Sequence, residues 1–234
     1  MSQTEISRFP LADLSGLPAD LAERIAAISE KSGFVPNVFL ALAHRPAELR
    51  AFMDYHDALM EKDEGLSKAE REMIVVATSA ENDCQYCVVA HGAILRIRAR
   101  NPLIADQVAI NWRKADISER ERAMLGYAVK VALRAQEIGP EDHAALYRAG
   151  FTQDEIWDIG SIAALFGMSN RLANMASIRP NEEFFLLGRM PRRLIWYELL
   201  DARLYSVSTT QVTKHSLHLD ALFCRDEVLS PNCG

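Results

Sequence analysis

Two cysteines and a histidine lie close together in the run Asn-Asp-Cys-Gln-Tyr-Cys-Val-Val-Ala-His, as Cys84, Cys87 and His91. If this run is helical, residues i, i+3 and i+7 share one face, so two thiols and an imidazole converge there. A thiol attacks a peroxide or a disulfide only as thiolate, and a free cysteine with a pKa near ~8.5 is mostly protonated at neutral pH. A helix N-terminus and a neighbouring base both favour the thiolate. The spacing therefore predicts a redox-active disulfide between Cys84 and Cys87.

The order in which the two sulfurs react depends on which of them is better activated. Asn82 or Asp83 is expected to cap the helix, which would put both cysteines in its first turn. His91, one turn beyond Cys87, can accept the proton of that thiol. Histidine proximity therefore favours attack by Cys87 and closure of the disulfide by Cys84, whereas helix position favours Cys84, and both orders stay open.

A histidine that acts as a base is usually held through its second nitrogen by a carboxylate. Glu72 is the candidate, because it lies in the otherwise apolar run Glu-Met-Ile-Val-Val-Ala-Thr and is expected to point inward. Glu81 is the rival carboxylate, three residues before Cys84. The alternative without chemistry is a surface pair between Glu72 and Lys68, four residues earlier on the same helix.

Several other polar residues have a structural and a functional interpretation. Tyr86, between the cysteines, can place its hydroxyl at the site or at the edge of the core. His56 and Trp112 are expected to be structural, and Asn170 is expected to hydrogen-bond a neighbouring backbone group. Zinc is the main competitor for the thiols, but three ligands are visible, with Glu72 as the candidate fourth, and no second Cys-x-x-Cys completes a closed site. We therefore expect no metal and no other cofactor.

The elements that must position these residues show a helical period along nearly the whole chain. Capping boxes at Ser67-x-x-Glu70, Ser118-x-x-Glu121 and Thr152-x-x-Glu155 predict three helix starts. No alternating stretch bounded by turn residues predicts a core strand, so the expected fold is all-α. The predicted helices cover about 18–31, 38–43, 46–61, 67–81, 84–99, 102–112, 118–137, 140–149 and 152–176.

The chain also contains an internal helical pseudo-repeat. The segment Leu-Ser-Lys-Ala-Glu-Arg-Glu-Met at 66–73 is echoed by Ile-Ser-Glu-Arg-Glu-Arg-Ala-Met at 117–124, 51 residues later. Two such helices can pack against each other with pseudo-symmetry, and a shared capping-box start without common ancestry is the alternative. At this offset each candidate site residue aligns with a residue of a different type: Glu72 with Ala123, Cys84 with Ala135, Cys87 with Ile138 and His91 with Asp142. Chemistry is therefore expected in the first copy alone.

Composition excludes several classes of protein. The 234 residues are 49% hydrophobic and 25% charged, which is typical of a globular domain. The net charge of -6, without a long Lys/Arg cluster, argues against nucleic acid as a partner. No window approaches ~18 apolar residues and no basic segment leads into an apolar run at the N-terminus, so we expect a cytoplasmic protein that is not bound to a membrane. Four cysteines are too few for a disulfide scaffold in so long a chain.

The combination of Glu72 with Cys84-x-x-Cys87-x-x-x-His91, on consecutive helices of an all-α chain, resembles the alkylhydroperoxidase AhpD-like family, which is related to carboxymuconolactone decarboxylases. The likeness is greatest to its peroxidase-related branch. It covers about residues 5–189, including the echo at 117–124 and the run Asn-Arg-Leu-Ala-Asn at 170–174. We therefore expect an AhpD-like all-α domain at 1–189 and a poorly ordered C-terminal extension at 190–234, with a helix near 192–204 at most.

This resemblance implies a homo-oligomeric enzyme that reduces organic hydroperoxides without haem, flavin or metal. Cys84 and Cys87 would be the redox pair, Glu72 and His91 the proton relay, and an external dithiol or a lipoyl-bearing protein the reductant. In the best-studied members a second histidine stands between the cysteines, and Tyr86 holds that place here. The alternatives are a general thiol-disulfide oxidoreductase, a redox sensor without turnover, and a zinc-stabilised structural protein.

Overall fold

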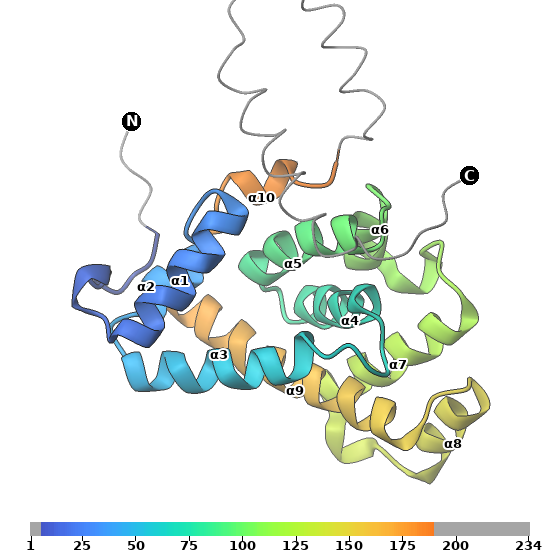
Figure 1. Ribbon diagram of the computed structural model, residues 1–234. Coiled ribbons are helices and arrows are strands. Elements are labelled where there is room, and N and C mark those ends of the chain that lie inside the picture. Colours follow the sequence, from blue (N-terminus) through green and yellow to red (C-terminus); the bar gives the residue numbers. More distant parts are fainter. Residues whose placement is uncertain (1–5, 190–234) are drawn as a thin grey trace, which may run out of the picture.

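The computed structural model describes residues 6–189, and its regular elements in that range are all helical, which confirms the predicted all-α fold (Figure 1). None of the helices described there is long and apolar enough to cross a membrane. The predicted extension at 190–234, including the helix near 192–204, lies outside the described residues. In chain order the helices are η1 (Leu14–Gly16), α1 (Ala19–Ser32), α2 (Asn37–Leu42), α3 (Pro46–Met60), α4 (Lys68–Glu81), α5 (Gln85–Arg98), α6 (Ile104–Asn111), η2 (Trp112–Lys114), α7 (Glu119–Arg134), η3 (Ala135–Glu137), α8 (Pro140–Arg148), α9 (Gln153–Ala176) and α10 (Glu183–Leu186).

The three predicted capping boxes are present at the starts of α4, α7 and α9. In each, a Ser or Thr hydroxyl accepts from the N–H of the Glu three residues on, and that carboxylate accepts from the cap N–H. Arg120, in the first turn of α7, donates to both Glu70 and Glu155. The N-termini of α4, α7 and α9 therefore meet at one corner of the molecule.

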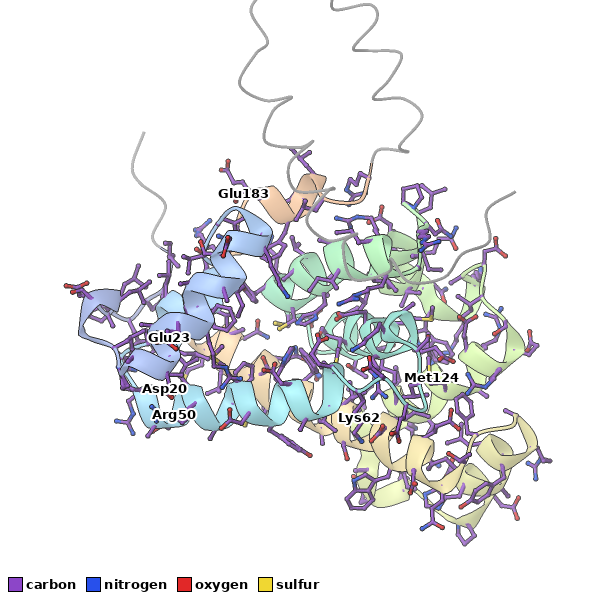
Figure 2. The ribbon with its side chains drawn as sticks, in the orientation of Figure 1. Asp20, Glu23, Arg50, Lys62, Met124 and Glu183 are labelled. Atoms are coloured by element: carbon purple, nitrogen blue, oxygen red, sulfur yellow. The ribbon has the colours of Figure 1, made fainter. Side chains whose placement is uncertain are left out.

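Helix α4 lies at the centre of the fold. It packs against α5, α6, α7 and α9, and Figure 1 shows α5 above it and the long α9 crossing below. Ten of its fourteen residues are buried, whereas α7 buries four of sixteen. Met124, labelled in Figure 2, is one of those four and joins the core cluster that includes Ile74, Leu125 and Phe166. Helix α4 is therefore the central element around which α5, α6, α7 and α9 pack.

An arginine at the same place in each copy holds the loop that leads into the helix. Arg71 donates through Nε to the carbonyl of Leu66 (3.1 Å), and Arg122 donates through Nη2 to that of Ile117 (3.2 Å). Arg71 is fully buried and also binds Asp158 on α9 (3.2 Å). The pseudo-repeat seen in the sequence thus extends to the hydrogen bonds of the two arginines.

Helix α2 and residues 178–189 close over α5. The N–H of Asn37 donates to Oδ1 of Asn181 (2.8 Å), and Nδ2 of Asn37 donates to the carbonyl of Arg179 (2.8 Å). The buried Arg96 of α5 donates to the carbonyls of Phe184 and Leu187 at the end of α10. Figure 2 marks the start of α10 at Glu183, beside α5. These bonds hold a cover along α5, with residues 184–187 bound to Arg96 near its C-terminal end.

The start of α5 differs from the prediction. Asn82 and Asp83 end α4 instead of capping α5, because the N–H of Asn82 donates to Thr78 and the N–H of Cys84 donates to Ser79 (2.9 Å). Asp83 has φ +50°, which turns the chain sharply. Cys84 itself is the N-cap, so Cys87 alone lies in the first turn of α5.

Candidate functional site

The two thiols lie inside the protein, at the junction of α5, α9 and the cover formed by α2 and residues 178–189. Cys84 is 0% exposed and Cys87 is 2% exposed. They pack in a small apolar cluster with neighbours such as Ala90, Ala173 and Ile178. Both thiols are free, in the reduced state.

Glu72 points inward and meets His91, as the sequence predicts. Its Oε2 lies 2.7 Å from Nδ1 of His91, and the residue is 7% exposed. A carboxylate at Nδ1 accepts the proton there, which leaves Nε2 as the nitrogen that can accept another. The interpretation of Glu72 as a surface partner of Lys68 is wrong, because Lys68 binds Glu61 (3.1 Å). The rival Glu81 is exposed and lies 4.0 Å from Arg113.

The environment shifts the pKa values of the two thiols in opposite directions. The hydrogen bond from the Cys87 thiol lowers the pKa of Cys84 to about 7 against the opposing effect of burial, helped by the backbone amide of Cys87, the Asn170 side chain and the backbone amide of Tyr86. Donation of its proton to Cys84, and then burial, raise the pKa of Cys87 well above its usual range. In the part of the chain that the structure describes, no hydrogen bond joins His91 to either thiol. Of the two orders left open by the sequence, the electrostatics favour Cys84 as the thiolate.

Helix α9 brings two polar side chains to the thiols. Oγ of Ser169 lies 4.0 Å from Sγ of Cys87. Nδ2 of Asn170 donates to Oγ of Ser79 (2.9 Å), and Oδ1 of Asn170 accepts from Nδ2 of Asn82 (3.0 Å). The expectation that Asn170 bonds a backbone group is therefore wrong, since its partners are side chains. A buried amide needs hydrogen-bond partners, so an Asn on the inner face of a predicted helix is the sequence signal for such side-chain contacts.

A second imidazole approaches His91 from α3. The ring centroids of His56 and His91 are 6.4 Å apart, and both rings contact Phe166, at 6.3 and 4.7 Å. Nδ1 of His56 is 3.0 Å from Oδ1 of Asp57, which also binds Arg24 (2.7 Å). The side chain of His56 is 28% exposed against 14% for His91. His56, expected to be structural, therefore lies near His91 and is the more exposed of the two imidazoles.

Tyr86 belongs to the edge of the core. Its hydroxyl accepts a hydrogen bond from the N–H of Val38 at the start of α2 (3.2 Å), and the residue is 5% exposed. Burial raises the pKa of Tyr86 well above its usual range, so the phenol stays protonated at neutral pH. The residue between the cysteines thus connects α5 to α2. Trp112 is buried in the main core, as the sequence predicts.

The zinc alternative lacks a set of ligands in the described residues. In residues 6–189, no three His, Cys, Asp or Glu side chains gather as metal ligands do. Glu72, which the alternative needs as fourth ligand, is bound to the nitrogen of His91 instead.

Comparison with known proteins places this site in a family context. The model of the carboxymuconolactone decarboxylase family matches residues 46–101, which contain Glu72, Cys84, Cys87 and His91. A search of curated proteins gave no match.

Solved structures extend the match over most of the chain. A protein from Ralstonia eutropha JMP134, described as an alkylhydroperoxidase AhpD core and an uncharacterized peroxidase-related protein, is 60% identical, with 81% of this chain and 100% of that chain covered and a TM-score of 0.80. An uncharacterized peroxidase-related protein from Silicibacter sp. TM1040 is 36% identical, with 81% and 99% covered and a TM-score of 0.75. The debrominase Bmp8, solved with 2,3,4-tribromopyrrole, is 19% identical, with 78% and 95% covered and a TM-score of 0.62. This last likeness is one of fold alone.

Proposed function

Because the chain belongs to the AhpD-like, peroxidase-related branch of the carboxymuconolactone decarboxylase superfamily, we propose that it is a thiol-dependent peroxidase that reduces organic hydroperoxides. The observation that carries the proposal is a buried thiol pair with opposite pKa shifts at the start of the helix whose His91 is held by Glu72. The names of the two relatives as peroxidase-related proteins support it. Homo-oligomeric assembly and a cytoplasmic location stay predictions.

In the first step the Cys84 thiolate attacks the terminal oxygen of the hydroperoxide. A sulfur–oxygen bond forms, the oxygen–oxygen bond breaks, and the alkoxide leaves with the electron pair. His91, protonated at Nε2, gives the alkoxide its proton and releases the alcohol, while Glu72 keeps the imidazole in the required orientation. Cys84 is then a sulfenic acid.

In the second step the thiol of Cys87 condenses with this sulfenic acid. The sulfur–sulfur bond forms, the sulfur–oxygen bond breaks, and the hydroxyl leaves as water with the proton of Cys87. An external dithiol, small or lipoyl-borne, then exchanges with the disulfide and restores both thiols. The sum is one hydroperoxide and one dithiol consumed for one alcohol, one water and one external disulfide formed.

The burial of the thiols favours a small oxidant over a protein disulfide. Exchange with a disulfide requires a thiolate to reach a sulfur atom directly, and Cys84 is 0% exposed. A folded protein cannot bring its disulfide to such an atom unless the cover opens widely. A small hydroperoxide or a small dithiol requires only a small opening. The peroxidase function therefore fits the site better than general protein disulfide reduction.

The test is hydroperoxide turnover by the reduced full chain with dihydrolipoamide as reductant. Wild type is expected to turn over cumene hydroperoxide, and Cys84→Ser and Cys87→Ser are each expected to fall to the uncatalysed rate, since both sulfurs are needed for the cycle. The matched control is the double variant Cys224→Ser/Cys233→Ser, which makes the same chemical change at the two cysteines outside the Cys-x-x-Cys motif and is expected to keep wild-type turnover. A wild type that consumes no hydroperoxide, or a single oxidation without turnover, would contradict the proposal; the latter result favours a redox sensor.

A further inference from the structure

Asn170 is a fully buried amide on the inner face of α9, next to the buried Ser169. It is 0% exposed, and its neighbours on the inner face of the helix include Phe166 and Ala173. Burying an amide is unfavourable unless its donors and acceptor are bonded. The positions of its partners therefore reveal what the amide faces.

In the structure the amide of Asn170 turns its oxygen towards Asn82 and its NH₂ group towards Ser79. Asn82 donates through Nδ2 to Oδ1 of Asn170 (3.0 Å), so the opposite end of the Asn170 side chain carries the NH₂ group. That group donates to Oγ of Ser79 (2.9 Å), and the carbonyl of Ser79 accepts from the N–H of Cys84 (2.9 Å). The NH₂ group thus lies against the residue that anchors the start of α5.

An amide NH₂ group has two protons, and the bond to Ser79 uses one. The other is left for a further acceptor, and the influence of the Asn170 side chain lowers the pKa of both Cys84 and Cys87. The preceding residue, Ser169, places its hydroxyl 4.0 Å from Sγ of Cys87. A donor to the charged form of a thiol stabilises the thiolate. Because His91 makes no hydrogen bond to either thiol in the described structure, the donors nearest the sulfurs come from α9 and the first turn of α5.

We propose that Asn170 binds the thiolate of the reduced Cys84–Cys87 pair through its NH₂ group and keeps that pair ionised at neutral pH. The inference deepens the proposed function, on which its consequence for turnover rests. The ionisation of the thiols is measurable without any hydroperoxide.

The test compares two substitutions that break the same Asn170–Ser79 hydrogen bond. Asn170→Leu removes the amide and keeps a side chain of similar size and no charge. Ser79→Ala removes the partner on α4 and leaves the amide in place. If the role of Asn170 were only to hold the turn at 82–84, both variants would have similar effects on the thiols.

The readout is the rate of alkylation of each cysteine by iodoacetamide against pH, followed by mass spectrometry of the reduced full chain. Asn170→Leu is expected to raise the pKa of Cys84 from about 7 by about one unit or more, so that the thiolate fraction at pH 7 falls about fivefold. Ser79→Ala is expected to shift it by less than about 0.3 unit, since the donor remains. An unchanged pKa in a folded Asn170→Leu protein, or equal shifts in both variants, would overturn the proposal.

A second measurement needs no variant and decides the matter if Asn170→Leu does not fold. In the ¹⁵N-labelled wild type, the side-chain NH₂ resonances of Asn170 are expected to titrate with the same pKa as the alkylation of Cys84. Resonances that stay constant through that range would overturn the proposal. Since neither measurement contains peroxide, an absence of turnover with a normal titration would remove the proposed function and leave the role of Asn170 standing.

Discussion

The helix pairs α4–α5 and α7–α8 begin alike and end differently. Each starts with a Ser-Glu capping box and an arginine that holds the preceding loop, and α4 and α7 pack against each other. In α4 most residues are buried, whereas α7 has a solvent-facing side. The shared features are those that start and anchor a helix, so the scaffold by itself does not make the site.

The second copy uses the position of the histidine for structure. Asp142, which corresponds to His91, binds Lys130 (2.7 Å) and accepts from the N–H of Gly139 at the start of α8 (2.8 Å). A carboxylate there secures the first turn of a short helix. In the first copy, His91 lies in the second turn of α5 and is held by Glu72, whose counterpart is Ala123. The 51-residue offset therefore joins an anchoring carboxylate in one copy to a histidine that, by our proposal, transfers protons in the other.

The contacts of helix α9 are a further difference between the two copies. It packs against both α4 and α7, but its polar pair Ser169 and Asn170 lies at the α5 end. A site with chemistry thus needs more than the right residues on one helix pair. It needs a third element that brings donors to the thiols.

The largest expected difference between the copies concerns the two arginines. Arg71→Met is expected to lower the free energy of unfolding by about 3–5 kcal/mol, because it leaves three backbone carbonyls without their donor and the buried Asp158 with Lys62 alone. Arg122→Met, at a side chain that is 28% exposed, is expected to cost about 1 kcal/mol. Urea denaturation followed by circular dichroism measures both. Equal losses would mean that the copies are anchored alike and that burial is not the difference.

The next effect concerns the carboxylate that exists in one copy alone. Glu72→Gln is expected to lower kcat/KM for hydroperoxide by about 10- to 100-fold, because a neutral amide orients and charges the imidazole less well than a carboxylate. Asp142→Asn is the matched control in the second copy and is expected to stay within about twofold of wild type, since the site lies elsewhere. Steady-state turnover at pH 7 with both proteins checked for folding measures this. A comparable loss in Asp142→Asn would assign the effect to helix stability.

The smallest effect is a pH dependence that belongs to the first copy. Because the folded pKa of Cys84 is lowered to about 7, its alkylation is expected to rise with pH and to be half-maximal near pH 7; from pH 7 to pH 6 the thiolate fraction falls about fivefold. In guanidinium, where the fold is lost, the same cysteine is expected to titrate near ~8.5. Lowering the pH therefore protonates this cysteine in the unfolded chain first, and the folded protein keeps the thiolate until the pH falls through about 7. Identical profiles for the folded and the unfolded chain would show that the surroundings of α5 do not activate this sulfur.

Much of the fold follows from local patterns. The three capping boxes predict helix starts that the structure confirms, and the apolar period predicts α1 to α9 closely. The inward direction of Glu72 is also predictable, because a carboxylate on the buried side of an apolar helix needs a partner. The N-cap of α5 is not predictable from the sequence. Asn82 and Asp83 are good caps by residue type, but in the structure they end α4 instead.

The sequence by itself determined the all-α class, the two consecutive helices around the Cys-x-x-Cys motif, and the inward direction of Glu72. The tertiary structure alone decided that Cys84 is the sulfur with the lowered pKa, that Tyr86 bonds to α2, and that His56 and Asn170 come to the site from α3 and α9. The physical reason is the separation along the sequence over which each kind of interaction acts. Helical period and capping act over a few residues and fix which side chains share a face. The contacts that tune the thiols join residues about 80–90 positions apart, and only the packing of whole helices brings them together.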